Sequence, residues 1–488
     1  MERQGERLHG EDLTFWWLDT PLQPTTMAML MLLDRRPDPV RLRAAMTRSV
    51  GAVPRLAQRV RDAPLDLTLP HWEDDPTFDL DYHLRHHAVP GGEWTELLRE
   101  IGPTYETPFD RSRPLWEARL YDGLAGDRAA LFFKLHHAVA DGVGGNAIFA
   151  AMTDWDRAGV AGDAPAATAV AGKGAWPGDE GMGRRLLDAL RDRVELDLDR
   201  AGAAARAIAD TVQDPARIGR ALSALRSLGE AMRFDSHSPL KQAAGRARRL
   251  SGMALPFPEV RAIKAAFGGT MIDVICTIMA RGLGAWHRAH RIGGVSEVMT
   301  LVPINLRKPE DWTDKAATGN VATGIMVRLP IAIRDPLEAF REVRARLETA
   351  KADPSASASP VIAEAISVLP RSLVTWLTEG TFGSLDFIVT NVPGMLVPRY
   401  LAGAEILAAY PFAPVASRSP VSVALYGYRD SLFIGINSDE ASMPDVERFH
   451  RAIDRAFREL RAAARGIVRR SPPPRRARPR GKSRARRG

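Results

Sequence analysis

Two stretches of this 488-residue sequence alternate short apolar, strand-like runs with amphipathic helical patterns, and this alternation limits the fold more than any other feature. The segment between them, from about residue 155 to 180, is rich in Ala, Gly, Pro and Asp, which is typical of a flexible linker. Strands interleaved with helices build layered α/β domains. The sequence therefore predicts two α/β subdomains, at residues 8–155 and 251–468, joined by a helical linker at 156–250.

The clearest strand covers residues 129–136. Its side chains alternate, with Leu131, Phe133 and Leu135 on one face of the pleat. The run at 27–33 is ambiguous between a strand and a short helix, and residues 71–84 look rich in loops. Helical patterns occur at 39–50, 258–267, 271–287 and 444–468, and strand-like runs at 298–306, 321–330, 384–394, 421–429 and 431–437.

Two amphipathic helices are predicted within the linker. The first has an apolar stripe formed by Leu187, Leu190, Val194 and Leu198, and the second begins at residues 214–215 with an Asp cap followed by Pro. Such stripes are usually packing faces, but an Arg-rich amphipathic connector can also lie in a lipid interface. The sequence leaves both interpretations open.

The formal net charge of +8 is concentrated at the C-terminal end. Residues 469–488 hold 10 of the 67 Lys and Arg residues and no Asp or Glu, so the rest of the chain carries 57 basic and 59 acidic residues. This Pro- and Arg-rich composition predicts a disordered basic tail. The tail is either a solubilising extension or a segment attracted to anionic lipid or nucleic acid. The body of the chain indicates no specific nucleic-acid partner.

The single cysteine, Cys276, excludes an intrachain disulfide and any multi-thiolate zinc or iron–sulfur site, and it lies in an apolar helical pattern that predicts a core position. No uncharged apolar run reaches the roughly 18 residues that span a bilayer, and the first residues lack a signal-peptide pattern. We therefore expect a cytoplasmic protein, with peripheral contact at the inner membrane face or at lipid bodies left open.

The segment KLHHAVADGVGG, at the end of the clearest strand, says most about function. It contains His136, His137, Asp141 and Gly142. A strand that runs into a glycine-rich turn holds side chains on a rigid support. Histidine titrates near neutral pH, so it can take a proton from a hydroxyl and return it to a leaving group. Successive strand residues point to opposite faces, so we expect only one of the two histidines to face a substrate channel.

Other interpretations of this segment compete with catalysis. A histidine is more often structural than catalytic, so a seven-residue pattern is a hypothesis until its context agrees. A metal site is a weak alternative, because neighbouring histidines on opposite strand faces cannot both reach one ion without a backbone distortion. No metal ion or prosthetic group is expected. The rest of the sequence must therefore decide between a catalytic and a structural role for this segment.

The surrounding sequence resembles one family at several separated places. HHAVADG fits the HHxxxDG motif of the CoA-dependent acyltransferase superfamily, and the flanking text resembles the bacterial wax ester synthase/diacylglycerol acyltransferase family over about residues 8–465. The resemblance is carried by DLTFWWLDTPLQPTTMAML, HWEDDPTFDLDYHLRHHAVP and PFDRSRPLWEARLYDGLAGDRAALFFKLHHAVADG, and then by TMIDV, LVPINLR, GNVATGIMVRLP, TNVPG and VALYGYRDSLFIGINSDEASMPD in family order.

This resemblance implies two chloramphenicol-acetyltransferase-like subdomains with a channel between them. Acyl-CoA would enter as cosubstrate from one side and a diacylglycerol or long-chain alcohol from the other. By analogy with the family, His137 would be the general base, with His136 in a supporting role. His137 would deprotonate the acceptor hydroxyl, which attacks the thioester without a covalent acyl-enzyme.

The resemblance also implies roles for residues around the motif. Asp141 would be structural, paired with an arginine for which Arg307 is our candidate, and Gly142 would serve the backbone conformation. Trp116 is more typical of a packed core aromatic than of a substrate contact. Asp273, Gly319, Asn320 and Asn391 match family motifs near the channel. The oxyanion donor is unassigned, with the backbone amides of DGVGG as one source.

The sequence departs from the family at two positions. Ile272 precedes Asp273 where the family usually has Asn, and Lys241 stands where the family favours Asn. Loss of the amide at 272 removes a hydrogen-bond donor and an acceptor. Two alternatives to the leading function stay open: an acyltransferase for a different hydroxyl acceptor, which Ile272 favours, and a catalytically weak protein that binds lipid surfaces, which the basic tail and the amphipathic linker support.

Overall fold

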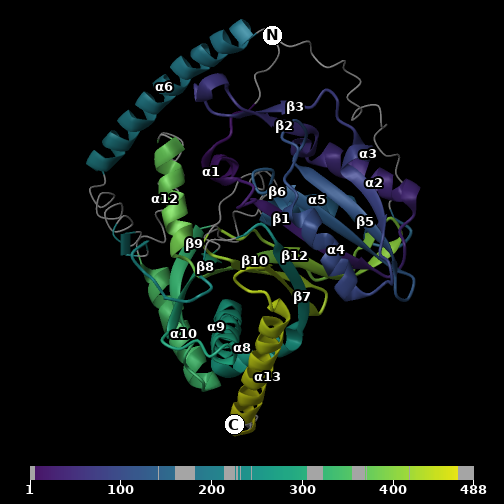
Figure 1. Ribbon diagram of the computed structural model, residues 1–488, viewed down its shortest axis with the longest axis vertical. Helices are drawn as coiled ribbons and strands as arrows, with labels where there is room; N and C mark the ends of the chain where they lie inside the picture. The colour runs from purple at the N-terminus through teal and green to yellow at the C-terminus, as the bar shows by residue number, and fades with distance from the viewer. Residues whose placement is uncertain are drawn as a thin grey trace, which may run out of the picture.

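A computed structural model describes residues 6–140, 142–159, 182–213, 226, 229–230, 232–242, 245–304, 323–353, 369, 371–416 and 418–470. Two six-stranded sheets, each covered by helices, dominate these residues (Figure 1). The predicted α/β architecture with two subdomains is therefore confirmed. The strand order is β11-β12-β1-β6-β5-β4 in the first sheet and β7-β14-β13-β10-β8-β9 in the second.

The first sheet is built around β1 (Thr26–Leu33) and β6 (Arg128–His136), which pair antiparallel. β5 (Trp116–Leu124) pairs antiparallel with β6, and β4 (Leu84–Ala88) lies parallel to β5. The alternation predicted for 129–136 is confirmed, because Leu131, Phe133 and Leu135 face one core and Phe132 faces another. The ambiguous run at 27–33 is a strand.

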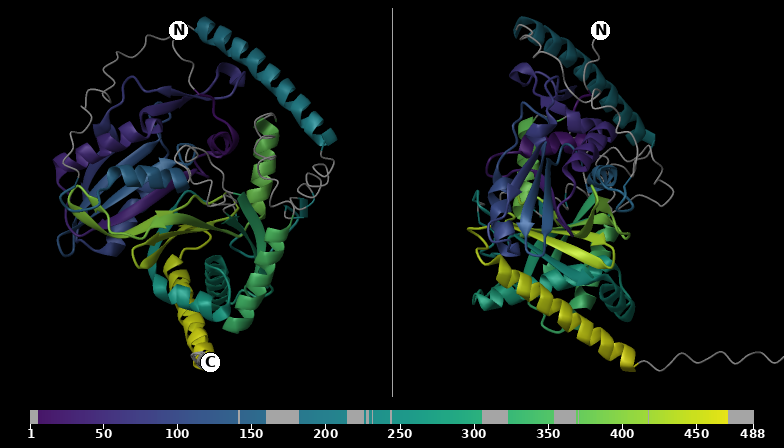
Figure 2. Two further views of the ribbon diagram at one scale, coloured as in Figure 1. Left: turned by 180° about the vertical axis from the view of Figure 1, so that it is seen from behind. Right: turned by 90° about the vertical axis from the view of Figure 1, so that its right-hand side faces the viewer.

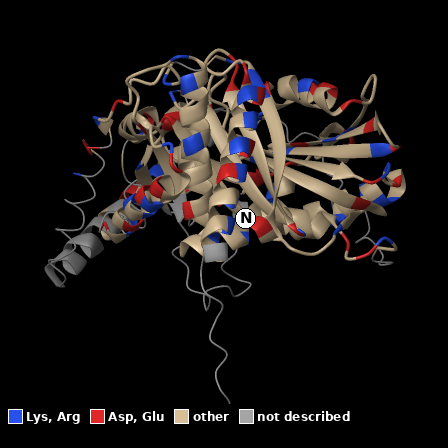
Figure 3. Cartoon of the chain, turned by 90° about the horizontal axis from the view of Figure 1, so that it is seen from below, with Lys and Arg blue, Asp and Glu red and all other residues tan. Residues whose placement is uncertain are grey.

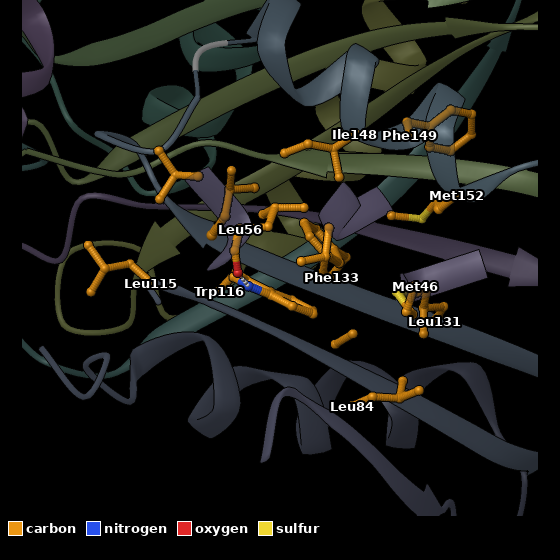
Figure 4. Close-up of a cluster of buried hydrophobic side chains, with 14 of the residues drawn as sticks. Met46, Leu56, Leu84, Leu115, Trp116, Leu131, Phe133, Ile148, Phe149 and Met152 are labelled. Atoms are coloured by element: carbon orange, nitrogen blue, oxygen red, sulfur yellow. Dashed lines mark hydrogen bonds between the residues drawn. The ribbon is translucent and has the colours of Figure 1, made fainter. Parts of the chain in front are cut away.

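Helices cover both faces of this sheet. On one face, α1 (Gly10–Leu18), α2 (Pro39–Ala52) and α5 (Gly142–Met152) contribute to a large apolar core, part of which is drawn in Figure 4. On the other face lies α4 (Trp94–Glu106). The sequence sets the start of α2 locally, because the Asp38 side chain accepts a hydrogen bond from the Arg41 N–H and Pro39 occupies the first turn.

A strand from the C-terminal half completes the first sheet. β12 (Ala404–Phe412) pairs antiparallel with β1, and β11 (Tyr400–Leu401) pairs with β12 at the edge. Gly435 of the second sheet permits the crossing, because a Cβ there would lie 1.7 Å from the Pro411 carbonyl oxygen. The predicted subdomains, 8–155 and 251–468, did not foresee that residues 400–412 of the second would join the sheet of the first.

The second sheet comprises β7 (Arg248–Pro256), β8 (Glu297–Ile304), β9 (Thr323–Pro330), β10 (Phe387–Met395), β13 (Val421–Tyr428) and β14 (Ser431–Asp439). Helices α8 (Phe257–Phe267), α9 (Met271–Ala289), α10 (Pro336–Ala352) and α13 (Val446–Arg470) cover one face of it. Almost all of α9 is buried, including Cys276, which confirms the predicted core position of that thiol. Burial raises the pKa of Cys276 to about 12, so the thiol is inert at neutral pH.

Buried polar contacts join the two halves. The guanidinium of Arg248 lies 3.2 Å from Asp439, with both side chains fully buried, and donates to the Leu22 carbonyl at 2.9 Å. The Tyr105 hydroxyl donates to the Thr26 carbonyl at 2.6 Å and accepts from Asn437 at 3.1 Å. The bond from Arg248 on β7 to Leu22 and the bond from Asn437 on β14 to Tyr105 on α4 cross between the halves, whereas the Arg248–Asp439 pair lies within the second sheet.

In the described part of the linker, α6 (Met182–Gln213) is a helix of 32 residues at the end of the molecule opposite the C-terminus of α13 (Figures 1 and 2). Its predicted apolar stripe does not face the protein. Leu187, Leu190, Val194 and Leu198 are 46–68% exposed, whereas Ala189 and Leu196 on the opposite face are buried. The packing interpretation of this stripe is therefore wrong. The start of the second predicted helix, at 214–215, lies outside the described residues.

Several elements went beyond the predicted pattern. The stretch 71–84 contains a strand, β3 (His71–Asp74), paired with β2 (Gln58–Arg61), and the single turn α3 (Leu80–His83). The glycines after Asp141 form the first turn of α5 rather than a separate turn. α12 (Arg371–Ser384) and the 3₁₀ turns Pro54–Ala57 and Pro64–Asp66 were also not predicted. Short or weakly apolar segments of this kind carry little periodicity.

Among the described helices, none is by itself both long and apolar enough to cross a bilayer. The pair α8 and α9 passes this test by length and composition together, but it bends by 99° at its junction.

Candidate active site

The two histidines lie where β6 ends, beside α1 and the segment that leads into β1. β6 closes with His136, whose N–H bonds the Leu115 carbonyl at 2.9 Å. The N–H of His137 bonds the Thr25 carbonyl at 2.8 Å. These backbone bonds fix the peptide that joins the two histidines.

His136 is almost fully buried, with 1% of its surface exposed. Its Nδ1 accepts the Ala138 N–H at 3.0 Å, so the ring proton sits on Nε2. Nε2 lies 2.9 Å from the Thr25 hydroxyl oxygen and 3.7 Å from Asp19. This network leaves no ring nitrogen of His136 available to a substrate, and it holds the turn from which the His137 side chain extends.

Asp19 is the anionic end of this network. It accepts the Thr25 N–H at 3.0 Å and a bond from Arg111 at 2.9 Å. Burial alone would raise the pKa of its carboxyl group, but the contacts with His136, Thr25 and Arg111 lower that pKa to about 2. Asp19 is therefore ionised at any pH at which the protein works.

His137 has a different environment. It remains partly exposed, and its ring stacks on Phe15 of α1 with 3.7 Å between centroids. Its Nδ1 is enclosed and bonds no other residue of the described chain. Burial lowers the pKa of the His137 imidazole to about 4, partly opposed by the carbonyl of its own backbone. The ring is thus neutral near pH 7.

Some of the other predicted site residues cannot be placed in the structure. Asp141, Arg307, Gly319 and Asn320 lie outside the described residues, so the proposed Asp–Arg pair stays a prediction. Gly142 is the first residue of α5.

The remaining predicted residues occupy clear positions. Trp116 is a core residue, 2% exposed, whose indole donates to the Leu56 carbonyl at 2.8 Å (Figure 4). Asp273 caps α9 in a reciprocal pair with Thr270, so its carboxylate serves the helix end. Asn391 is exposed on β10, the strand that packs beside α5.

The positions that depart from the family are structural as well. The Ile272 side chain packs against the core of the second sheet. Lys241 donates to the Phe234 carbonyl at 3.0 Å.

Sequence reasoning missed Phe15, Asp19 and Thr25. Their segment, residues 12–30, was noticed only as part of a family resemblance, and nothing in its local pattern connects it with residues 136–137. The antiparallel pairing of β1 with β6 brings them together, because it places Thr26 opposite His136. Within the described residues, no cluster of His, Cys, Asp and Glu could hold a metal ion.

Two family models match the chain. The wax ester synthase/diacylglycerol acyltransferase catalytic domain matches residues 8–275, and the C-terminal domain of the same family matches residues 318–461. A Mycobacterium tuberculosis protein named as a diacylglycerol O-acyltransferase is 31% identical over 454 residues, which cover 90% of this chain and 88% of that protein. A Mycobacterium bovis protein of the same description is 26% identical over 455 residues, covering 90% and 91%.

Solved structures agree at the level of the fold. The wax ester synthase/diacylglycerol acyltransferase from Marinobacter aquaeolei VT8 superposes with a TM-score of 0.64 at 20% identity, covering 94% of this chain and 99% of that one. The first condensation domain of the calcium-dependent antibiotic synthetase gives a TM-score of 0.57 at 18% identity, covering 94% and 96%. With both family models and the relatives in agreement, the chain belongs to the wax ester synthase/diacylglycerol acyltransferase family and is an O-acyltransferase.

Proposed function

We propose that this enzyme transfers a long-chain acyl group from acyl-CoA to diacylglycerol or a fatty alcohol, with His137 as general base. The observation that carries the proposal is the environment of His137: a neutral imidazole with Nδ1 enclosed, Phe15 stacked on its face and part of its surface open. The names of the relatives support the substrate class.

The reaction needs one base and no covalent intermediate on the protein. His137 Nε2 takes the proton of the acceptor hydroxyl while the alkoxide oxygen attacks the thioester carbonyl. The tetrahedral intermediate collapses, the C–S bond breaks, and the CoA thiolate recovers the proton from the imidazolium. A base with a low pKa in a desolvated site releases that proton readily, which suits the return step.

The start of α5 supports a second part of the proposal. α5 begins at Gly142, five residues after His137, and the N-terminal end of a helix favours negative charge. We place the oxyanion of the tetrahedral intermediate near this end. CoA leaves after each turnover, and the proposed reaction requires no metal ion or prosthetic group.

The test uses purified full-length protein, labelled long-chain acyl-CoA and a panel of diacylglycerols, fatty alcohols and other hydroxyl acceptors. We expect ester formation with a diacylglycerol or fatty alcohol, and loss of at least a hundredfold in kcat for His137→Ala with unchanged thermal unfolding. Turnover confined to other acceptors would replace the proposed acceptor class. Retained activity in His137→Ala would contradict the general-base role.

The acceptor and product are poorly soluble in water, so we also propose that the enzyme works at a lipid surface. The exposed apolar stripe of α6 supports this part, because an amphipathic helix with an open apolar face partitions into lipid interfaces. Binding to vesicles without turnover in any acceptor mixture would favour a lipid-binding role over an enzymatic one.

A further inference from the structure

A groove between α9 and α13 carries an excess of positive charge. It has a volume of about 320 Å³. Figure 3 shows the molecule from below, from the side on which α13 ends, with Lys and Arg in blue and Asp and Glu in red. The walls of the groove come from Arg281, Ala285, Arg288, Ala289, Ala452, Arg455, Ala456 and Glu459. Three guanidinium groups thus share the groove with one carboxylate.

Small residues keep this groove open and fix its walls. The alanines on both helices leave the space that longer side chains would fill. Gly282 lets α13 approach, because a Cβ there would lie 3.0 Å from Ile453. Gly284 lets the segment after β9 approach, since a Cβ there would lie 1.9 Å from the Ile331 carbonyl oxygen. That segment carries Arg334 toward the groove.

Arg281 forms the floor and is held rigidly. Its side chain is only 8% exposed, with one terminal nitrogen bonded to Glu459 and the other to the Arg334 carbonyl. Its Nε is buried and has no partner among the described residues. No ion pair involves Arg288, Arg334 or Arg455 in the part of the chain that the structure describes.

The cations of the groove repel one another. Burial lowers the pKa of Arg288, and the neighbouring Arg334 and Arg281 lower it further, while Glu459 alone opposes them. An anion in the groove would relieve this repulsion. The groove is lined by the fixed Arg281 and by the exposed Arg288 and Arg455. Such a lining suits a tetrahedral oxyanion, because a guanidinium group can donate parallel N–H bonds to it.

We propose that the groove between α9 and α13 binds a phosphate group, through Arg281, Arg288 and Arg455. The ligand is either free phosphate or the phosphomonoester headgroup of a lipid, which share this chemistry. The site belongs to the second subdomain, whereas His137 follows strand β6 of the first sheet. It therefore serves neither the base nor the α5 terminus in the proposed reaction.

The experiment compares two double variants of the full chain that lose equal charge. Arg288→Gln with Arg455→Gln alters the groove, and Arg451→Gln with Arg341→Gln removes two exposed arginines that do not line it. Titration calorimetry measures inorganic phosphate binding without any substrate, so its result does not depend on acyl transfer. Sedimentation with phosphatidylcholine vesicles compares added phosphatidic acid with added phosphatidylglycerol at equal molar content.

We expect the groove variant to bind inorganic phosphate at least tenfold more weakly than the wild type, and the control variant to bind within twofold of it. A matching loss with phosphatidic acid vesicles, but not with phosphatidylglycerol, identifies a lipid headgroup as the source. A loss confined to inorganic phosphate identifies free phosphate. The proposal is overturned if the wild type binds neither probe, or if both variants lose binding equally. The basic tail is present in every variant, so its contribution to binding does not affect the comparison between them.

Discussion

At the scale of single residues, the site separates two adjacent histidines by environment. Both ring nitrogens of His136 form internal bonds, to Thr25 and Ala138. The ring of His137 instead stacks on Phe15, and its lowered pKa keeps the imidazole neutral. The second histidine of the pair is thus the one with a ring nitrogen to spare.

The low pKa of His137 predicts an unusual pH profile. A general base must be unprotonated, and His137 gains its proton only near pH 4 rather than near 6.5. We therefore expect kcat/KM to stay constant between about pH 5.5 and 7.5 and to fall only at lower pH. Because the folded ring resists protonation, stability should also fall as the pH drops from about 6.5 toward 4. An acid limb near pH 6.5 in the rate profile would contradict the assignment.

Thr25 is predicted to act as a positioning residue. Thr25→Val keeps the side-chain volume but removes the hydroxyl that meets His136 Nε2. We expect kcat to fall about ten- to a hundredfold with little change in KM, because displacement of the His136–His137 peptide misplaces the base. Thr47→Val, which removes a helix-backbone bond in α2, is the matched control and should leave kcat unchanged. A change in KM alone would speak against positioning.

At the scale of elements, α6 carries an apolar face whose side chains are exposed. The periodicity of the sequence predicted the apolar face correctly, but it did not predict that the face would be exposed. The helix is anchored by its other side, where Ala189 and Leu196 are buried and Arg193 bonds the Leu67 carbonyl at 3.3 Å.

Polar substitutions on that face test the lipid-surface proposal. Leu190→Gln with Val194→Gln should weaken binding to phosphatidylcholine vesicles about tenfold, because apolar area is lost from the interface. Thermal unfolding should not change, since both side chains are exposed. Val40→Gln with Val468→Gln, also exposed, is the control. A chain that ends at residue 470 measures the contribution of the basic tail separately. Equal binding by both double variants would remove α6 from the lipid contact.

At the scale of the whole molecule, two sheets are held together by buried polar bonds and by the exchanged strand β12. One of these bonds runs from Arg248 to the Leu22 carbonyl, and Arg248 is itself paired with Asp439 of the neighbouring strand β14, completely removed from solvent. This pair also lies next to an exposed pair, Arg249 with Glu440, which offers an internal comparison.

Breaking the buried pair should destabilise the whole protein. Arg248→Met or Asp439→Asn should each lower the free energy of unfolding by about 3–5 kcal/mol, because a charge is left without compensation. Arg249→Gln, in the exposed pair, should cost less than about 1 kcal/mol. Denaturant unfolding of the three variants checks this. Equal costs at the two positions would show that burial adds nothing to the contribution of the Arg248–Asp439 pair.

The sequence by itself determined the features that depend on local order. Alternation along 129–136, the Asp38 cap of α2 and the HHAVADG segment needed no knowledge of distant residues, and family resemblance pointed to a candidate site around His137. Only the tertiary structure decided which distant segments meet. Residues 404–412 joined the first sheet, Phe15 and Thr25 reached the histidines, and Arg288 and Arg455 came to line one groove. The reason is physical: periodicity shows that a face is apolar or charged, but long-range packing decides what covers it.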